Sequence, residues 1–310
     1  MRVVESINRK LHELMAADEN LIVLGEDILD PYGGAFKVTK GLSTAFPDRV
    51  WTTPISEGGI IGMGVGLALK GKPVIAELMF GDFILLAADQ LINHAGKFRW
   101  MYNDQVEIPL IVRAPMGGRR GYGPTHSQSL EKHFCGAPGI TVFATNEYAD
   151  PGLILQKAFA SRTPHLIIEN KVMYARPVLG PDALPRHANA DVVIVTYGGS
   201  VEHAVAAAAK LAEEEEILVS IVAIEQLSPF PDAYVQSALQ GCTRVVCVEE
   251  GASGWGFGSE CARALIGQIK RFKSVSGPDH PLPSSREWEA DVLPDSGVIA
   301  RACLDLFEKG

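Results

Sequence analysis

Short apolar runs recur along the chain and are separated by longer segments with a different apolar spacing. The runs occupy residues 21–24, 72–77 and 109–113. They lack the alternation of a half-exposed strand, which is typical of strands buried on both faces of a parallel sheet. Residues 1–19 instead place apolar side chains at helical spacing, which predicts an amphipathic helix. This succession of strands and helices predicts a doubly wound α/β fold.

The same pattern places the other elements of the first half of the chain. It predicts further strands over 140–143 and 165–169, and helices over 36–46, from 84 to about 101, from His126 onwards, and over 150–161.

A second α/β unit follows a proline-containing segment. Pro177, Pro181 and Pro185 fall within a polar stretch, which is typical of a linker between domains. The pattern beyond it predicts strands over 191–196, 217–224 and 244–249, with helices over 201–215 and from 259 to about 270. We therefore predict a first domain over residues 1–178, a linker over 179–190 and a second domain over 191–310.

Composition restricts the class of protein. The chain has 310 residues, of which 47% are apolar and 21% charged, so it can bury a sizeable core. Its net charge of −9 argues against a nucleic-acid partner or an anionic membrane surface. Residues 1–8 lack the apolar stretch of a signal peptide, and no apolar run is long enough to span a bilayer. The five cysteines are odd in number and include no C-x-x-C pair, so we expect a reduced, cytoplasmic protein.

Glu57 is the first candidate for a site. It follows Ser56, a residue type that caps helices, and precedes a run of small and aliphatic residues, 58–69. Acids are common in first helical turns, so a favourable interaction with the helix dipole is the simpler interpretation of Glu57 alone. The glycines of the run argue for a functional role, because each costs on the order of 1 kcal/mol of helix propensity relative to alanine. They indicate close approach by another helix or by a ligand.

Two further positions are candidates. Glu26 follows the apolar run 21–24, and in open α/β sheets ligands bind beyond the carboxyl ends of the strands. A solvated turn acid is an equally good interpretation of Glu26. His126 ends a glycine-rich stretch, 114–126, and long loops within compact domains are usually functional or disordered. No G-x-G-x-x-G, Walker, H-E-x-x-H or G-x-S-x-G motif is present.

Three stretches together resemble one family. They are residues 53–57 with their Ile-Ser-Glu motif, the block from Glu77 to Gln90, and the loop that ends in His126-Ser-Gln. The chain is similar to the β subunit of the thiamine-diphosphate-dependent E1 component of 2-oxoacid dehydrogenase complexes, within the transketolase-like superfamily. The resemblance spans nearly the whole chain and implies a pyrimidine-binding domain followed by a transketolase C-terminal domain. It also implies decarboxylation of a 2-oxoacid and transfer of the acyl group to a lipoyl carrier.

The resemblance implies a role for each candidate residue. Glu57 would hydrogen-bond N1′ of the aminopyrimidine of thiamine diphosphate, beside Ile55 of the same motif, and so help the cofactor lose its C2 proton. Phe83 would stack on the aminopyrimidine ring, and Glu26 would lie near it and join a proton relay. His126 would face the substrate and exchange protons with its oxygen near neutral pH. From the residues alone, a core side chain is the simpler interpretation of Phe83, and His126 could be a loop histidine that caps a helix.

An absent motif predicts a partner. The superfamily holds Mg²⁺ and the diphosphate with a Gly-Asp-Gly motif, whereas this chain has Gly81-Asp82-Phe83 and no Gly-Asp-Gly. The resemblance therefore implies that an α subunit supplies most of the Mg²⁺ and diphosphate site, in an α2β2 heterotetramer. We accordingly expect no metal ligand in this chain. A lipoyl-bearing E2 acyltransferase is a second candidate partner.

Two other interpretations fit the same residues. A split transketolase-like carboligase would transfer a two-carbon unit with Glu57 and Phe83 in the same roles, and a non-catalytic interaction subunit would keep the pocket without the activity. Arg119 and Arg120 depart from the family's pattern. They could meet a substrate carboxylate or a partner chain, although a solvated loop position is the simpler interpretation.

Overall fold

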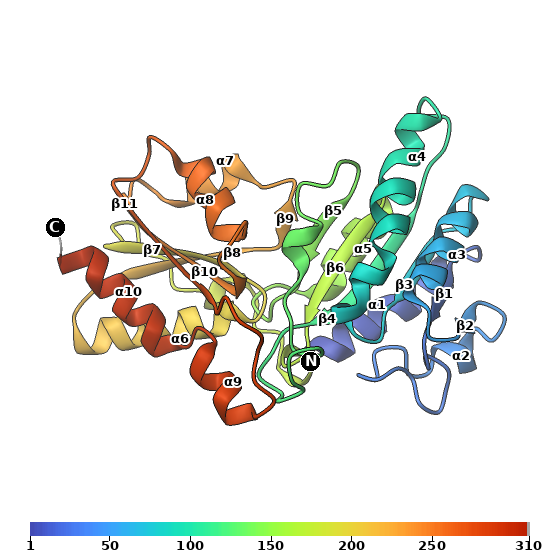
Figure 1. Cartoon of the computed structure of the whole chain (residues 1–310), viewed down its shortest axis with the longest axis horizontal. Coiled ribbons are helices and arrows are strands. Elements are labelled where there is room, and N and C mark those ends of the chain that lie inside the picture. Colours follow the sequence, from blue (N-terminus) through green and yellow to red (C-terminus); the bar gives the residue numbers. More distant parts are fainter. Residues whose placement is uncertain (309–310) are drawn as a thin grey trace.

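Two β-sheets with helices on both faces make up the structure. The computed structural model describes residues 1–308, and its sheets lie side by side, the first built mainly from the N-terminal half (Figure 1). The strand order in the first sheet is β2-β1-β3-β4-β6-β5-β9. Its strands are β1 (Ile22–Gly25), β2 (Val50–Thr52), β3 (Val74–Glu77), β4 (Leu110–Met116), β5 (Thr141–Ala144), β6 (His165–Asn170) and β9 (Gln226–Ser228).

The first sheet is buried on both faces, as its unbroken apolar runs predicted. Helices α1 (Val3–Ala17) and α5 (Pro151–Ser161) contact each other and cover one face, while α3 (Glu57–Leu69) covers the other. Along β1, Val23 belongs to the core beneath α1 and α5, whereas Ile22 and Leu24 belong to the core beneath α3.

The second sheet is entirely parallel and has the order β11-β10-β7-β8. Figure 1 shows α6 and α10 below this sheet and α7 and α8 above it. The core on the α7 and α8 side is continuous with the core of the first sheet. The elements are β7 (Val192–Tyr197), α6 (Ser200–Glu214), β8 (Val219–Ile224), α7 (Asp232–Ala238), β10 (Arg244–Ala252), α8 (Phe257–Leu265), β11 (Arg271–Gly277), α9 (Arg286–Val292) and α10 (Ser296–Glu308).

The fold confirms the prediction of two doubly wound α/β units, with one strand shared between them. Strand β9 comes from the second half of the chain, yet it pairs antiparallel with β5 at the edge of the first sheet. The predicted boundaries at residues 178 and 191 stay a prediction. Within residues 1–308, no helix is both long enough and apolar enough to cross a bilayer.

The helix predicted over 36–46 is wrong for most of its length. Only α2 (Leu42–Ala45) is helical, and the residues before it form turns and bends. Gly41, with φ of +85°, cannot continue a right-handed helix from the preceding residues. The side chain of Asp30 accepts hydrogen bonds from the Gly41 and Thr44 N–H groups, so it fixes the turn from outside.

The helices predicted from residue 84 and from His126 also differ from the structure. The first is a succession of a 3-10 helix η1 (Gly81–Ala87), a π-helix η2 (Gln90–Ala95) and α4 (Gly96–Met101). The spacing of apolar residues alone does not distinguish 3-10, α- and π-helical turns. Residues 126–130 are irregular, and only the short 3-10 helix η3 (Glu131–His133) follows. The remaining short 3-10 turns are η4 (Met173–Ala175) and η5 (Pro181–Ala183).

A buried arginine joins three neighbouring strands of the first sheet. Arg113 on β4 is 0% exposed. Its Nη1 donates to Glu77 Oε2 on β3 (2.5 Å), and its Nε and Nη2 donate to the two carboxylate oxygens of Glu169 on β6 (2.8 and 2.6 Å). The Tyr174 hydroxyl adds a hydrogen bond to Glu169 Oε2 (2.6 Å). Buried charges are stable only when fully paired in this way.

We predict that Arg113→Met destabilises the chain by about 3–5 kcal/mol, because it leaves two carboxylates buried without their cation. Urea unfolding of the full chain measures the effect. As a control, Arg99→Met breaks an exposed ion pair with Asp104 and should change the free energy of unfolding by about 0.5 kcal/mol or less. Equal losses from the two variants would contradict the structural role of Arg113.

Candidate functional site

The candidate site lies where parallel strands of the first sheet end together. Strands β1, β3, β4 and β6 are in parallel register, so the segments that follow them emerge at one edge. Gly25 at the end of β1 lies so close to β3 that a Cβ atom there would be 2.5 Å from the Glu77 carbonyl oxygen. This edge carries Glu26, residues 78–83, the loop after β4, and Lys171.

Glu26 and Glu57 form a buried acidic pair at this edge. Both side chains are buried, at 3% and 5% exposure, and Oε1 of Glu26 has no hydrogen-bond partner among residues 1–308. Burial, and then the charge of Glu57, raise the pKa of Glu26, while backbone groups of Met79 and Ser56 oppose the rise. Glu26 lies in a turn but is buried, so the interpretation of it as a solvated turn acid is wrong.

Helix α3 holds Glu57 at its first position. The Ser56 hydroxyl accepts a hydrogen bond from the Gly59 N–H (3.3 Å), which confirms the predicted cap. The glycines of this helix allow close packing, since a Cβ atom on Gly58 would lie 3.1 Å from the Leu86 carbonyl oxygen. Buried Ile60 and Ile61 lie three and four positions after Glu57, on the same face of the helix, so apolar side chains neighbour Glu57 on α3.

Phe83 and His126 form a second group, in which aromatic rings meet edge to face. The two ring centroids are 5.2 Å apart, and Phe80 lies 5.1 Å from His126 in the same arrangement. Phe83 and His126 are both half-buried. The segment from Met79 to Phe83 connects the two groups, because Met79 interacts with Glu26 and Phe83 contacts His126.

Ile55 is not buried with either group. Its side chain is 81% exposed, although it precedes the buried Glu57 by only two positions. Among residues 1–308, no three His, Cys, Asp or Glu side chains are grouped so that they could hold a metal ion.

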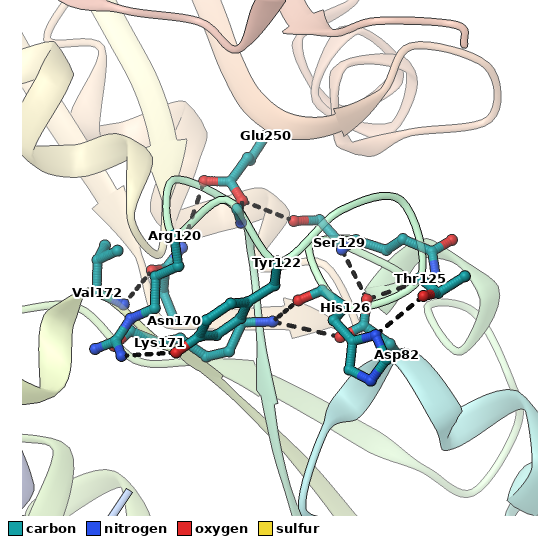
Figure 2. Close-up of polar contacts among 12 residues, drawn as sticks. Asp82, Arg120, Tyr122, Thr125, His126, Ser129, Asn170, Lys171, Val172 and Glu250 are labelled. Atoms are coloured by element: carbon teal, nitrogen blue, oxygen red, sulfur yellow. Dashed lines mark hydrogen bonds and ion pairs between the residues drawn. The ribbon is translucent and has the colours of Figure 1, made fainter. Parts of the chain in front are cut away.

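Lys171 and Asp82 fix the position of His126. The Lys171 side chain is fully buried, and its Nζ donates to the His126 carbonyl oxygen (2.5 Å) and to Asp82 Oδ2 (3.3 Å) (Figure 2). The other Asp82 oxygen accepts from the Gln128 N–H (2.8 Å). The bond from Lys171 engages the His126 carbonyl oxygen that a helix starting at His126 would use, and the predicted helix does not form there.

Glu250 from the second domain holds both ends of the glycine-rich loop, residues 117–129. Its Oε1 accepts from the Gly118 N–H (2.6 Å) and from the Ser129 hydroxyl (3.2 Å) (Figure 2). The sequence analysis did not single out Lys171 or Glu250 as site residues. Lys171 directly follows β6 and Glu250 lies near the carboxyl end of β10. A charged residue at the carboxyl end of a buried strand is the signal that could have found them.

Comparison with known proteins identifies the family. Residues 1–177 match the pyrimidine-binding domain of transketolase, and residues 181–299 match the transketolase C-terminal domain. The chain belongs to the transketolase-like family.

Similar proteins include β subunits of two-chain enzymes of this family. The chain is 31% identical to the mitochondrial pyruvate dehydrogenase E1 component subunit beta-1 of Arabidopsis thaliana, over 97% of this chain and 88% of that protein. It is 32% identical to the 3-methyl-2-oxobutanoate dehydrogenase subunit beta of Mycobacterium tuberculosis, over 92% and 86%. The chain therefore belongs to the branch that contains E1 beta subunits of pyruvate and branched-chain 2-oxoacid dehydrogenases.

Two further comparisons extend this family. The chain is 34% identical to the acetoin:2,6-dichlorophenolindophenol oxidoreductase subunit beta of Cupriavidus necator, over 98% of this chain and 97% of that protein. A solved structure described as a split gene transketolase, inactive beta4 tetramer, has the same fold, with a TM-score of 0.81, 22% identity and 99% coverage of each chain.

We predict that Glu57→Gln lowers the pKa of Glu26. The change removes the negative charge of Glu57, which is one of the two main causes that raise this pKa, and leaves the burial of Glu26 in place. Carbon-13 NMR titration of carboxyl-labelled glutamates in the full chain measures it. The exposed Glu107→Gln is the control and should leave the pKa of Glu26 unchanged. An unshifted Glu26 pKa in Glu57→Gln would show that the two acids do not interact.

Proposed function

We propose that this chain is the β subunit of a thiamine-diphosphate-dependent 2-oxoacid dehydrogenase E1, which decarboxylates a 2-oxoacid and passes the acyl group to a lipoyl carrier. The buried pair of Glu26 and Glu57 at the start of α3 is the observation that carries the proposal. It supplies a carboxyl group in apolar surroundings, with a buried Glu26 oxygen that no group of residues 1–308 satisfies. The similar dehydrogenase β subunits support the same reaction class.

The residues present fit the pyrimidine half of thiamine diphosphate. Glu57 would accept or share a proton with N1′ of the aminopyrimidine, and the apolar surroundings would strengthen that hydrogen bond by excluding water. Phe83 is half-buried and offers a ring face to the aminopyrimidine. The bound cofactor would supply the electron sink that decarboxylation needs.

His126 would act on the substrate. Its ring is held by Phe80 and Phe83, its backbone by Lys171, and one ring nitrogen lies 3.0 Å from the Thr125 hydroxyl. A positioned, half-exposed imidazole can give or take a proton at a substrate oxygen near neutral pH. Glu26, beside Glu57, would hold a proton within a relay.

An α subunit would complete the site, in an α2β2 heterotetramer. The chain has no Gly-Asp-Gly motif, so the diphosphate and Mg²⁺ would be held mainly by that partner. Ile55 on the way into α3, Met63 on α3, and Leu85 and Leu86 on η1 are exposed apolar side chains. Apolar side chains exposed beside a site are typical of surfaces that a partner subunit covers. We keep the cytoplasmic location and a lipoyl-bearing E2 partner as predictions.

The test is to co-express the chain with the α subunit encoded beside it and to measure decarboxylation with an artificial electron acceptor. Pyruvate, 3-methyl-2-oxobutanoate and acetoin are the substrates to compare. We expect turnover of a 2-oxoacid that requires both thiamine diphosphate and Mg²⁺, and none from this chain alone. Glu57→Gln should lower turnover by about 10²-fold or more, because it removes the carboxyl group that would share a proton with N1′ of the aminopyrimidine. The exposed Glu19→Gln should not.

Each other result assigns the chain differently. Cofactor binding without decarboxylation, together with two-carbon transfer between sugars, would support the carboligase. Unaltered turnover in Glu57→Gln would support a subunit whose pocket no longer takes part in catalysis.

A further inference from the structure

An arginine-lined cavity lies between the two domains, beside the glycine-rich loop. It has a volume of about 540 Å³. Its walls come from the loop itself, from residues 172–176 after β6, and from helices α6 and α9 of the second domain. The polar side chains that line it include Arg119, Arg120, Tyr122, Arg176, His203 and Arg286.

The charge of this cavity is opposite to that of the chain. Four guanidinium groups line it, whereas the chain as a whole has a net charge of −9. The acid in the lining is Glu202, which forms an ion pair with Arg176. Glu289 lies behind the loop, where its Oε2 accepts from the Gly121 N–H (2.5 Å). The remaining three arginines have no ion pair within residues 1–308, and concentrating them in one place is costly unless an anion binds there.

Three of these arginines still have donors to offer. Arg119 donates through Nη2 to the Pro294 carbonyl oxygen (2.6 Å), but its Nε is buried and has no partner in the part of the chain that the structure describes. Arg120 donates to the Tyr122 hydroxyl (3.2 Å) and to the Lys171 carbonyl oxygen (2.9 Å), which holds its guanidinium in place (Figure 2). Arg286 is exposed, and no hydrogen bond or ion pair of its side chain is found within residues 1–308.

Arg119 and Arg120 are held by hydrogen bonds to the fold, so they are not freely solvated loop side chains. Both are half-buried, and Arg119 has a φ of +69°, a conformation that non-glycine residues seldom adopt. His203 on α6 faces the same cavity. Burial, and then the charge of Arg119, lower the pKa of His203 to about 4, so the imidazole is neutral at pH 7 in the absence of an anion.

We propose that this cavity binds a phosphate dianion, either the free ion or the phosphate group of a small phosphorylated molecule. Guanidinium groups bind phosphate through paired, charge-assisted hydrogen bonds, and several converging on one space match its several oxygens. A monocarboxylate would need fewer cations than the cavity supplies. The volume admits a phosphate together with a small organic group.

The cavity is connected to the candidate site through the side chains of Tyr122 and Phe80. The Tyr122 hydroxyl accepts from Arg120, while its ring meets Phe80 edge to face at 6.1 Å, and Phe80 in turn contacts His126. A phosphate bound at Arg120 would therefore lie two side chains from His126. The binding site itself does not depend on the function proposed above.

The test is calorimetric titration of the full chain at constant ionic strength, without an α subunit or thiamine diphosphate. The probes are inorganic phosphate and glycerol 3-phosphate, with acetate as the monoanion control. We expect one phosphate site per chain and affinity for acetate at least about tenfold weaker, since a dianion gains more charge-assisted hydrogen bonds. Glycerol 3-phosphate binding as tightly as phosphate would identify a phosphorylated metabolite as the ligand, and binding of inorganic phosphate alone would identify the free ion.

Arg286→Gln is the decisive variant, because the loss of a side chain without partners should leave the fold intact. It should weaken phosphate binding by about tenfold or more, and Arg120→Gln should do the same. Arg301→Gln removes the same charge from the exposed surface of α10 and should leave the affinity unchanged. Thermal unfolding of each variant checks its fold.

Equal affinity for phosphate in wild type and Arg286→Gln, or no preference for phosphate over acetate, would overturn the proposal. Because this titration measures binding without turnover, its failure would leave the 2-oxoacid dehydrogenase assignment untouched. Failure of the dehydrogenase assay would equally leave the phosphate site in place.

Discussion

The buried guanidinium of Arg113 is the constraint on which the site depends. A charge without access to water must keep all its partners, so Glu77 on β3 and Glu169 on β6 are held at fixed positions on either side of β4. The chain leaves these strands immediately afterwards to form residues 78–83, the glycine-rich loop and Lys171. Those three segments carry Phe83, His126 and the cation that holds the His126 backbone. The ion cluster therefore fixes the origin of each segment.

Residues of the second domain fix the glycine-rich loop that leaves the first domain. The glycine-rich loop leaves the first sheet, but Glu250 holds both its ends, Glu289 holds the Gly121 N–H, and the Pro294 carbonyl oxygen accepts from Arg119. A long loop without regular structure loses considerable conformational entropy when it is ordered. Hydrogen bonds to charged, partly buried groups offset that loss more effectively than bonds to water-exposed groups. The position of His126 is thus a property of both domains together.

The sequence predicted the strands and most long helices, because burial on both faces and helical periodicity are local patterns. It failed where a distant side chain binds the backbone, as Asp30 does at residues 41–44 and Lys171 at residue 126. Glu57 could be selected from its cap and glycines, and its assigned role came from family resemblance. Asp82, Lys171 and Glu250 act through contacts between remote segments, which a single sequence does not display. Arg119 and Arg120 were visible, but their convergence with Arg176 and Arg286 was not.

The shared strand β9 has a consequence for how this polypeptide can be divided. Residues 226–228 supply the last strand of a sheet whose other strands end at residue 170. A fragment cut in the linker would leave β5 with unpaired backbone N–H and C=O groups along an open edge, and such edges recruit strands from other molecules. Strand β9, from the second half of the chain, therefore covers the edge of the first sheet that would otherwise be open to pairing with other molecules.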